Sequence, residues 1–311
     1  DSGDIRADLA LRTRGLMYRN RGLPDISGKI SLADGIADME LSAGGSNARA
    51  KAGIAGGAVD CEFALYVPRI SDFQACADSS EIAGEIAARG TLRGRLQSPE
   101  IHASIEGHSI KYDNFPIDSL EGAVTWKNGA LFFADIRGGG HIASFDSLRS
   151  RLHVDGLTGG MRYECRIDGS LSSPRAHVDA RMEKPSYRGV SFDSGDLFAE
   201  VHGDTLRVAH AILDRGPLLV HGECVFDYRG LTGAAAAGLM ERACDGGLVP
   251  QGECKAWFDL KNAHSVDVGF QARALSPGTL KALFPFMADI GGTVDCRSEE
   301  RRVGKECRSR W

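Results

Sequence analysis

Residues 98–136 read SPEIHASIEGHSIKYDNFPIDSLEGAVTWKNGALFFADI, and the chain repeats this pattern 75 residues later without a gap. Around this stretch, ten residues are identical within a window of about 40. The identical pairs are Gly94/Gly169, Leu96/Leu171, Ser98/Ser173, Pro99/Pro174, His102/His177, Tyr112/Tyr187, Asp118/Asp193, Ser119/Ser194, Leu131/Leu206 and Ala134/Ala209. Repetition in one register indicates that a supersecondary unit is stacked along the chain, each copy covering the open face of its neighbour. The sequence therefore predicts an elongated repeat scaffold rather than a compact enzyme.

Apolar and polar residues alternate along most of the chain, which is typical of strands with one buried face. Residues 59–67, 220–228 and 266–274 are clear examples. The pairs Asp34-Gly35 and Asn128-Gly129 lie 94 residues apart in a second, weaker copy of the pattern. Such pairs favour tight type I′ hairpin turns, which need positive φ angles. We therefore expect a mainly β fold, built as a repetitive antiparallel sheet.

Helical signals are few, so we expect only a few short helices. Residues 276–286 begin with Ser-Pro, a good N-cap and first-turn pair, and residues 68–76 occupy the matching place about 207 residues earlier. Residues 234–244 carry a helical apolar stripe and predict a third helix. The expected segments are 1–89 (partial repeat and short helix), 90–164 and 165–233 (repeat units), 234–296 (further β segment with short helices) and 297–311 (tail).

Charge argues against a nucleic-acid partner. The formal net charge is -5; residues 297–311 carry six basic and three acidic residues, net +3, which leaves -8 for residues 1–296. Nucleic acid needs a clustered basic surface, which an acidic body does not offer. Residues 298–311 resemble translated adapter or vector sequence and are set aside as non-native; a disordered charged tail is the alternative.

The chain begins at Asp1 without Met, a basic segment or an apolar signal segment. Its apolar runs are shorter than the roughly 18 residues that a membrane-spanning helix needs. We therefore expect an internal fragment, with any targeting signal or anchor outside it.

Motifs for catalysis or metal binding are missing from the sequence. No cysteine pair is spaced C-x-x-C, and the glycines at 138–140 lack the Lys and Ser or Thr of a phosphate-binding loop. His102 and His177 are repeat equivalents at outward strand positions. Four cysteines fall in phase with the apolar rows, where a thiol acts as a small hydrophobic side chain: Cys61, Cys165, Cys224 and Cys254. In an oxidising compartment, disulfides between some of them remain an alternative. We expect no enzyme, no cofactor and no metal site.

The stretch 98–136 resembles the TamB and AsmA-like family of bacterial envelope proteins. The family's repeated unit has a G-x-L-x-x-P start, a tyrosine turn, a "pIDSL" segment, an "NGAL" hairpin and a glycine-rich end. In this chain the five parts lie, in the same order, at 94–99, Tyr112, 116–120, 128–131 and 138–140. The second copy keeps the start at 169–174, the tyrosine at Tyr187 and part of the third segment at 192–194, and it has residues 202–204 in place of the hairpin. Residues 274–294 are similar to linkers of that family. The resemblance covers most of residues 15–296.

The resemblance implies a long, curled β-sheet shaped like a taco, anchored in the inner membrane and reaching across the periplasm. It also implies an apolar groove for phospholipid acyl chains and, for some members, an Omp85-type outer-membrane partner. The N-terminal membrane helix and the C-terminal region that define TamB-type proteins are not in this sequence. The membrane anchor and the outer-membrane partner are therefore expected from the family resemblance alone.

The expected groove is lined by one apolar row per strand. The predicted lining residues are Ile101, Ala103, Ile105, Val124, Trp126, Leu131, Phe133, Val178, Ala199, Val201, Leu206 and Val208. The same rows also fit a closed sandwich or β-helix core filled by its own side chains, and periodicity does not separate the two.

Three functions follow from these observations. The first is phospholipid transport between the inner and outer membranes. The second is a scaffold for outer-membrane protein assembly, which pairs an exposed strand edge with its partner. The third is a repetitive surface adhesin.

Overall fold

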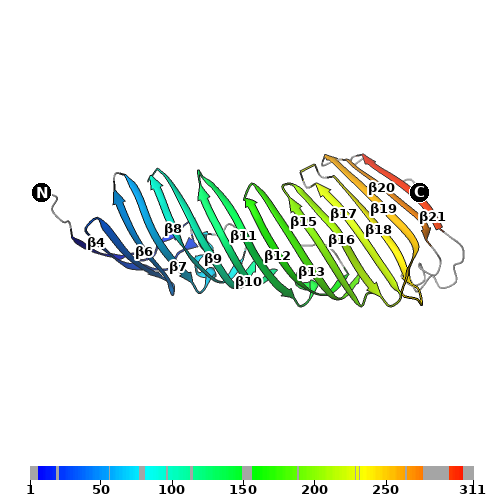
Figure 1. The fold of residues 1–311 in the computed structure, drawn as a ribbon, viewed down its shortest axis with the longest axis horizontal. Coiled ribbons are helices and arrows are strands. Elements are labelled where there is room, and N and C mark those ends of the chain that lie inside the picture. Colours follow the sequence, from blue (N-terminus) through cyan, green and yellow to red (C-terminus); the bar gives the residue numbers. More distant parts are fainter. Residues whose placement is uncertain are drawn as a thin grey trace. The chain divides into compact units, whose positions relative to one another are not determined.

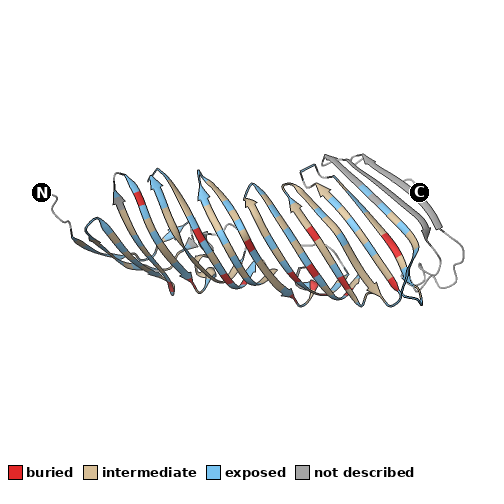
Figure 2. Cartoon of the chain, viewed as in Figure 1, coloured by how far each residue is buried: buried red, intermediate tan, exposed pale blue. Residues whose placement is uncertain are grey.

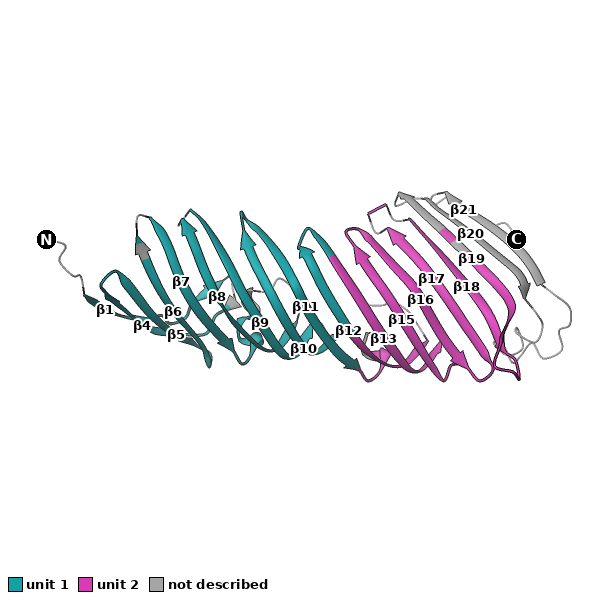
Figure 3. Cartoon of the chain, in the orientation of Figure 1, with its two compact units in different colours: residues 1–141, 164–174 teal, residues 142–163, 175–311 magenta. Residues whose placement is uncertain are grey.

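A computed structural model describes residues 6–18, 21–55, 57–76, 81–95, 97–112, 115–148, 156–187, 189–227, 229–230, 232–262, 265–275 and 294–303. The described residues lie mainly in β-strands, and the antiparallel sheet that they form is not closed. The predicted mainly β fold class is therefore confirmed. The chain divides into two compact units, residues 1–141 with 164–174 (unit 1) and residues 142–163 with 175–311 (unit 2), coloured separately in Figure 3.

Unit 1 is an antiparallel meander in which each long strand pairs with the next one in the chain (Figure 1). Its strands are β1 (Ala7–Arg12), β4 (Ile26–Ala33), β5 (Ile36–Ala43), β6 (Ser46–Ala55), β7 (Ala58–Val67), β8 (Ile82–Arg95), β9 (Ser98–Tyr112), β10 (Phe115–Lys127) and β11 (Ala130–Ile142). A separate small hairpin, β2 (Met17–Tyr18) with β3 (Arg21–Gly22), lies between β1 and β4 in the chain. The short 3₁₀ helix η1 (Ile70–Cys76) packs against β8.

Unit 2 continues the same pattern from β13 to β21. Its elements are η2 (Phe145–Leu148), β12 (Leu157–Ser170), β13 (Ser173–Tyr187), β14 (Val190–Ser191), β15 (Ser194–His202), β16 (Thr205–Arg215), β17 (Leu218–Asp227), β18 (Thr232–Arg242), β19 (Leu248–Asn262), β20 (Ser265–Leu275) and β21 (Val294–Val303). The second half of β12, from Glu164, belongs to unit 1.

The 75-residue repeat of the sequence reappears in the strand bounds. Strand β8 spans 82–95 and β12 spans 157–170, while β9 spans 98–112 and β13 spans 173–187. The repeated element is thus a pair of long antiparallel strands. The segment limits expected after residues 89, 164 and 233 fall inside β8, β12 and β18.

The two hairpin turns have the predicted type I′ geometry. Asp34 and Gly35 have φ of 52° and 74°, and Asn128 and Gly129 have φ of 52° and 76°. Positive φ at both central residues gives the turn a twist that matches the flanking strands. These turns fix which residues of β4 and β5, and of β10 and β11, face each other.

The helix expected at 234–244 is wrong, because this segment forms β18. Alanines favour a helix in isolation, but pairing on both sides overrides that preference. Ala235 pairs with Cys224 of β17, and Ala237 pairs with Gly222 of β17 and Cys254 of β19. The helix expected at 68–76 is present as η1, and the one expected at 276–286 lies outside the described residues.

A β-bulge recurs with the same 75-residue shift. Ser109 in β9 has φ 49° and lies opposite Gly84 with φ 115°; Lys184 in β13 has φ 46° and lies opposite Gly159 with φ 108°. A side chain on Gly84 would lie 2.6 Å from the Ile110 Cα. The extra residue shifts the alternation by one position, so Ile110 is buried to 7% exposure.

Among the described residues few side chains are buried, and Figure 2 shows them spread over many strands. In unit 1, Val67 and Ile110 are buried near the ends of β7 and β9. In unit 2, the buried residues include Ile142, the last residue of β11, and Phe145, the first residue of η2. Most other described strand residues are half-buried or exposed. The sheet therefore depends mainly on its ladder of backbone hydrogen bonds and on contacts between half-buried side chains of neighbouring strands.

The bulge predicts a glycine that cannot be replaced. Gly84→Ala should lower the free energy of unfolding by roughly 2–3 kcal/mol, because it combines a positive φ with a backbone clash. Gly53→Ala in β6 is the matched control, since its added Cβ meets nothing within 4 Å. Urea denaturation measures both, and equal midpoints for the two variants would contradict the assigned bulge geometry.

Candidate functional site

Side chains of unit 1 that face each other across the strands form three continuous apolar rows. The first row contains Ala7, Leu32, Ala37, Ala52, Cys61, Leu92, Ile101, Trp126 and Leu131. The second contains Leu9, Ile30, Met39, Ala50, Phe63, Gly90, Ala103, Val124 and Phe133. The third contains Leu11, Gly28, Leu41, Ala48, Leu65, Ala88 and Ile105. Because facing residues project to the same side of a sheet, these rows form one surface, which we name the apolar face.

All seven lining residues predicted in unit 1 lie in these rows, on β9, β10 and β11. Ala103 is 8% exposed and Trp126 is 41% exposed, and the other five are half-buried. The structure therefore brings these seven residues together on one face.

The five lining residues predicted in unit 2 also share one face. Val178 of β13 faces Ala199 of β15, which faces Val208 of β16, while Val201 faces Leu206 in the next row. The rows run on into β17 and β18 through Cys224, Ala235, Phe226 and Gly233. Ala199 is buried and the other four predicted residues are half-buried.

The apolar face of unit 1 is open rather than packed under a second layer. Leu9 is 62% exposed, Leu11 42% and Leu65 38%. Side chains in a closed sandwich core would be as buried as Ile142, which is 1% exposed. Among the described residues, the closed-core alternative does not fit this face.

The opposite face carries the polar residues of the alternation, joined by ion pairs between strands. Arg93 lies 3.0 Å from Asp60, and the Lys127 Nζ lies 2.7 Å from a Glu100 oxygen. The hydrogen bond from Lys127 lowers the pKa of Glu100. Exposed pairs like these add little stability. They do favour the observed register, because a shift by one residue would turn charges onto the apolar face.

Two half-buried thiols, Cys61 in the first apolar row and Cys165 on β12, are protonated at neutral pH. Burial raises the pKa of Cys165, and burial together with the neighbouring Asp60 and Glu62 raises the pKa of Cys61. A protonated thiol is a poor nucleophile and metal ligand. These cysteines therefore act as small apolar side chains, as their place in the sequence pattern predicts.

No group of three or more His, Cys, Asp or Glu side chains in the described ranges is arranged to hold a metal ion. Within the same part of the chain, no helix has the length and hydrophobicity needed to cross a membrane. No protein-family model, curated protein or solved structure matches this chain. The family resemblance of the sequence therefore stays a prediction.

The predicted lining set covers only part of the apolar face. Most of the face belongs to β1 and β4–β8, where Ile30, Met39 and Phe63 occupy the second row. The alternation between residues 26 and 67, together with the turn at Asp34-Gly35, could have predicted these further lining residues. The bulge at Ser109 could not have been predicted, because the alternation of apolar and polar residues does not show where its phase shifts.

The reactivity of the thiols tests the burial of Cys61 and Cys165. In single-cysteine variants, Cys61 and Cys165 should react with iodoacetamide more slowly than the exposed Cys244. Because the pKa of each is raised, the pH midpoint of its reaction should lie above the usual thiol range. Mass spectrometry of the alkylated protein follows the rates. Equal rates at all three cysteines would contradict the assignment.

Proposed function

We propose that this chain is part of a scaffold that carries phospholipids between the inner and outer membranes, with the acyl chains lying along the apolar face. The observation that supports it is the run of apolar residues across nine strands of unit 1, only partly covered by the protein itself. An exposed apolar patch of this extent marks a binding surface. Each methylene group removed from water gains roughly 0.8 kcal/mol.

The dimensions of the face suit an acyl chain. Three rows two residues apart cover about 13 Å along the strands, and nine strands cover about 38 Å across them. The longer dimension exceeds one extended fatty acyl chain. A lipid tail can therefore lie across the strands with its headgroup in water.

Movement along such a face needs no catalytic group. The rows offer Ala or Gly beside larger side chains, such as Ala50 between Met39 and Phe63, so a guest chain meets a shallow apolar surface throughout. Each step exchanges one apolar contact for another of similar free energy. A place in the bacterial envelope, an inner-membrane anchor and an Omp85-type partner come from the sequence resemblance and belong to the same proposal.

A photo-crosslinking amino acid tests the proposal in each unit. Placed at Val124 or Val208, it should crosslink to phospholipid in cells, because both positions lie on apolar rows. Placed at the exposed neighbours Ser104 or Arg207, it should give little lipid adduct. Mass spectrometry of the purified adducts identifies the lipid.

Two results would contradict the proposal. One is equal lipid labelling at Val124 and Ser104, which would indicate that both faces of the sheet contact a membrane and that lipid does not bind to the apolar face alone. The other is crosslinking from Val124 to protein alone, which would favour the scaffold for outer-membrane protein assembly.

A further inference from the structure

The polar side of unit 1 has a hollow of its own. Its volume is about 800 Å³, and it crosses β1 and β4–β8. On β8 it is lined by Ala87 and Arg89 but not by Ala88, whose side chain belongs to the apolar face. The hollow therefore opens on the face opposite to the apolar rows.

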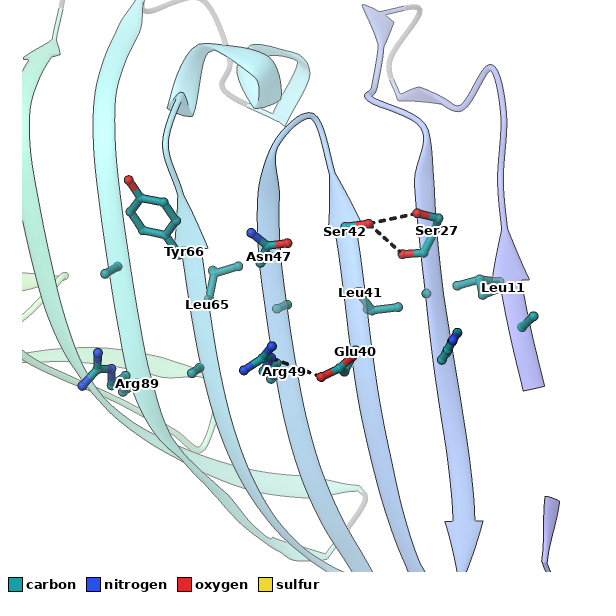
Figure 4. A pocket seen from close by; sticks show the side chains of 16 residues that line it. Leu11, Ser27, Glu40, Leu41, Ser42, Asn47, Arg49, Leu65, Tyr66 and Arg89 are labelled. Atoms are coloured by element: carbon teal, nitrogen blue, oxygen red, sulfur yellow. Dashed lines mark hydrogen bonds and ion pairs between the residues drawn. The ribbon is translucent and has the colours of Figure 1, made fainter. Parts of the chain in front are cut away.

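Two rows of polar side chains border this hollow, as Figure 4 shows for the labelled residues. One row contains Lys29, Glu40, Arg49 and Arg89. The other contains Ser27, Ser42, Asn47 and Tyr66. Between the two rows the floor is formed by residues whose side chains point to the apolar face, among them Leu41 and Leu65. The result is a trough with a charged wall and a neutral, hydrogen-bonding wall.

The charged wall has a net positive charge of two, from three cations and one carboxylate. The Arg49 Nε lies 3.2 Å from the Glu40 Oε1, which offsets one cation. Among the described residues, Lys29 and Arg89 are in no ion pair. A local positive charge in a chain of net charge -5 favours an anionic ligand.

An adjoining hollow on the same face has no excess of positive charge. It measures about 510 Å³ and shares Lys29, Glu40 and Arg49 with the first. It adds Lys51 together with Asp38 and Glu62, so its positive and negative side chains balance. The excess positive charge is thus confined to the larger hollow.

The cations are regularly spaced, which argues for an extended ligand. Lys29, Arg49 and Arg89 lie in one cross-strand row, each two strands from the next. Two strand spacings amount to about 10 Å, and the hollow as a whole crosses about 24 Å of sheet. A compact anion would reach one cation, whereas a chain with repeated negative charges can reach all three.

The neutral wall points to sugar hydroxyls. The Ser27 and Ser42 hydroxyls lie 2.9 Å apart, and the side-chain amide of Asn47 follows in the same row. Tyr66 donates its hydroxyl hydrogen to the Glu85 Oε2 at 3.0 Å, which fixes a ring that is 44% exposed. Hydroxyl and amide groups pair with sugar hydroxyls, and an aromatic ring packs against the apolar side of a sugar ring.

We propose that this hollow binds an acidic oligosaccharide that carries a carboxylate on every second sugar. Lys29, Arg49 and Arg89 hold successive carboxylates, and Tyr66 packs against a sugar ring. The site lies on the face that the lipid proposal does not use, so the two bind independently.

The test is isothermal titration calorimetry of the full chain with a hexasaccharide of alternating glucuronate and N-acetylglucosamine. The neutral hexamer of N-acetylglucosamine is the ligand control. We expect the acidic hexasaccharide to bind and the neutral one not to, with an affinity that falls as salt is added. The double variant Lys29→Gln/Arg89→Gln should weaken binding at least about tenfold, since two charge-assisted hydrogen bonds are lost. Lys51→Gln, outside the hollow, should change it by about twofold or less.

Several results would overturn the site. Equal binding of the neutral hexamer would show that the cations do not determine binding. Equal binding of a glutamate hexapeptide would show that the hollow attracts anions without recognising sugars. Unchanged binding by the double variant would place the ligand elsewhere. The double variant should keep the lipid crosslink at Val124, which separates failure of this site from failure of the lipid proposal and from misfolding.

Discussion

The structure depends on cross-strand register. In unit 1, nine strands pair so that an apolar residue faces an apolar residue at every step of two complete rows. A slip of one residue in any pair would turn a whole strand over and place its charges among the apolar side chains. Two-residue turns such as Asn128-Gly129 fix the register locally, and the ion pairs on the polar face favour it further. Each strand thereby extends the surface of its neighbour.

This register separates two surfaces with different chemistry on one thin sheet. The apolar face has few fully buried side chains, since the small residues in its rows leave it shallow and open. The polar face carries charged rows whose local composition differs from one hollow to the next. A sheet without a thick core can therefore present two binding surfaces, and the bulges opposite Gly84 and Gly159 keep apolar residues on the apolar side where the alternation shifts.

Much of the fold follows from local sequence signals. The alternation, the type I′ turns and the 75-residue repeat predict antiparallel strands, and β9 and β13 have matching bounds for that reason. The segment 234–244 misled because alanine favours a helix when no partner strand is considered, whereas Cys224 and Cys254 lie opposite it in the fold. The bulge at Ser109 and the hollow beside Arg89 depend on which residues meet across strands, and no single strand encodes that. The predicted lining residues lie on one face in each unit because no bulge interrupts the alternation between the lining residues of one strand.

In unit 1, successive strands direct their apolar side chains to one open face. Spin labels placed one at a time at residues 101–106 of β9, in a background without other cysteines, test this arrangement. Collisions with a water-soluble nickel complex should alternate with a period of two, low at 101, 103 and 105 and high at 102, 104 and 106. Accessibility without that period, or with the opposite phase, would contradict it.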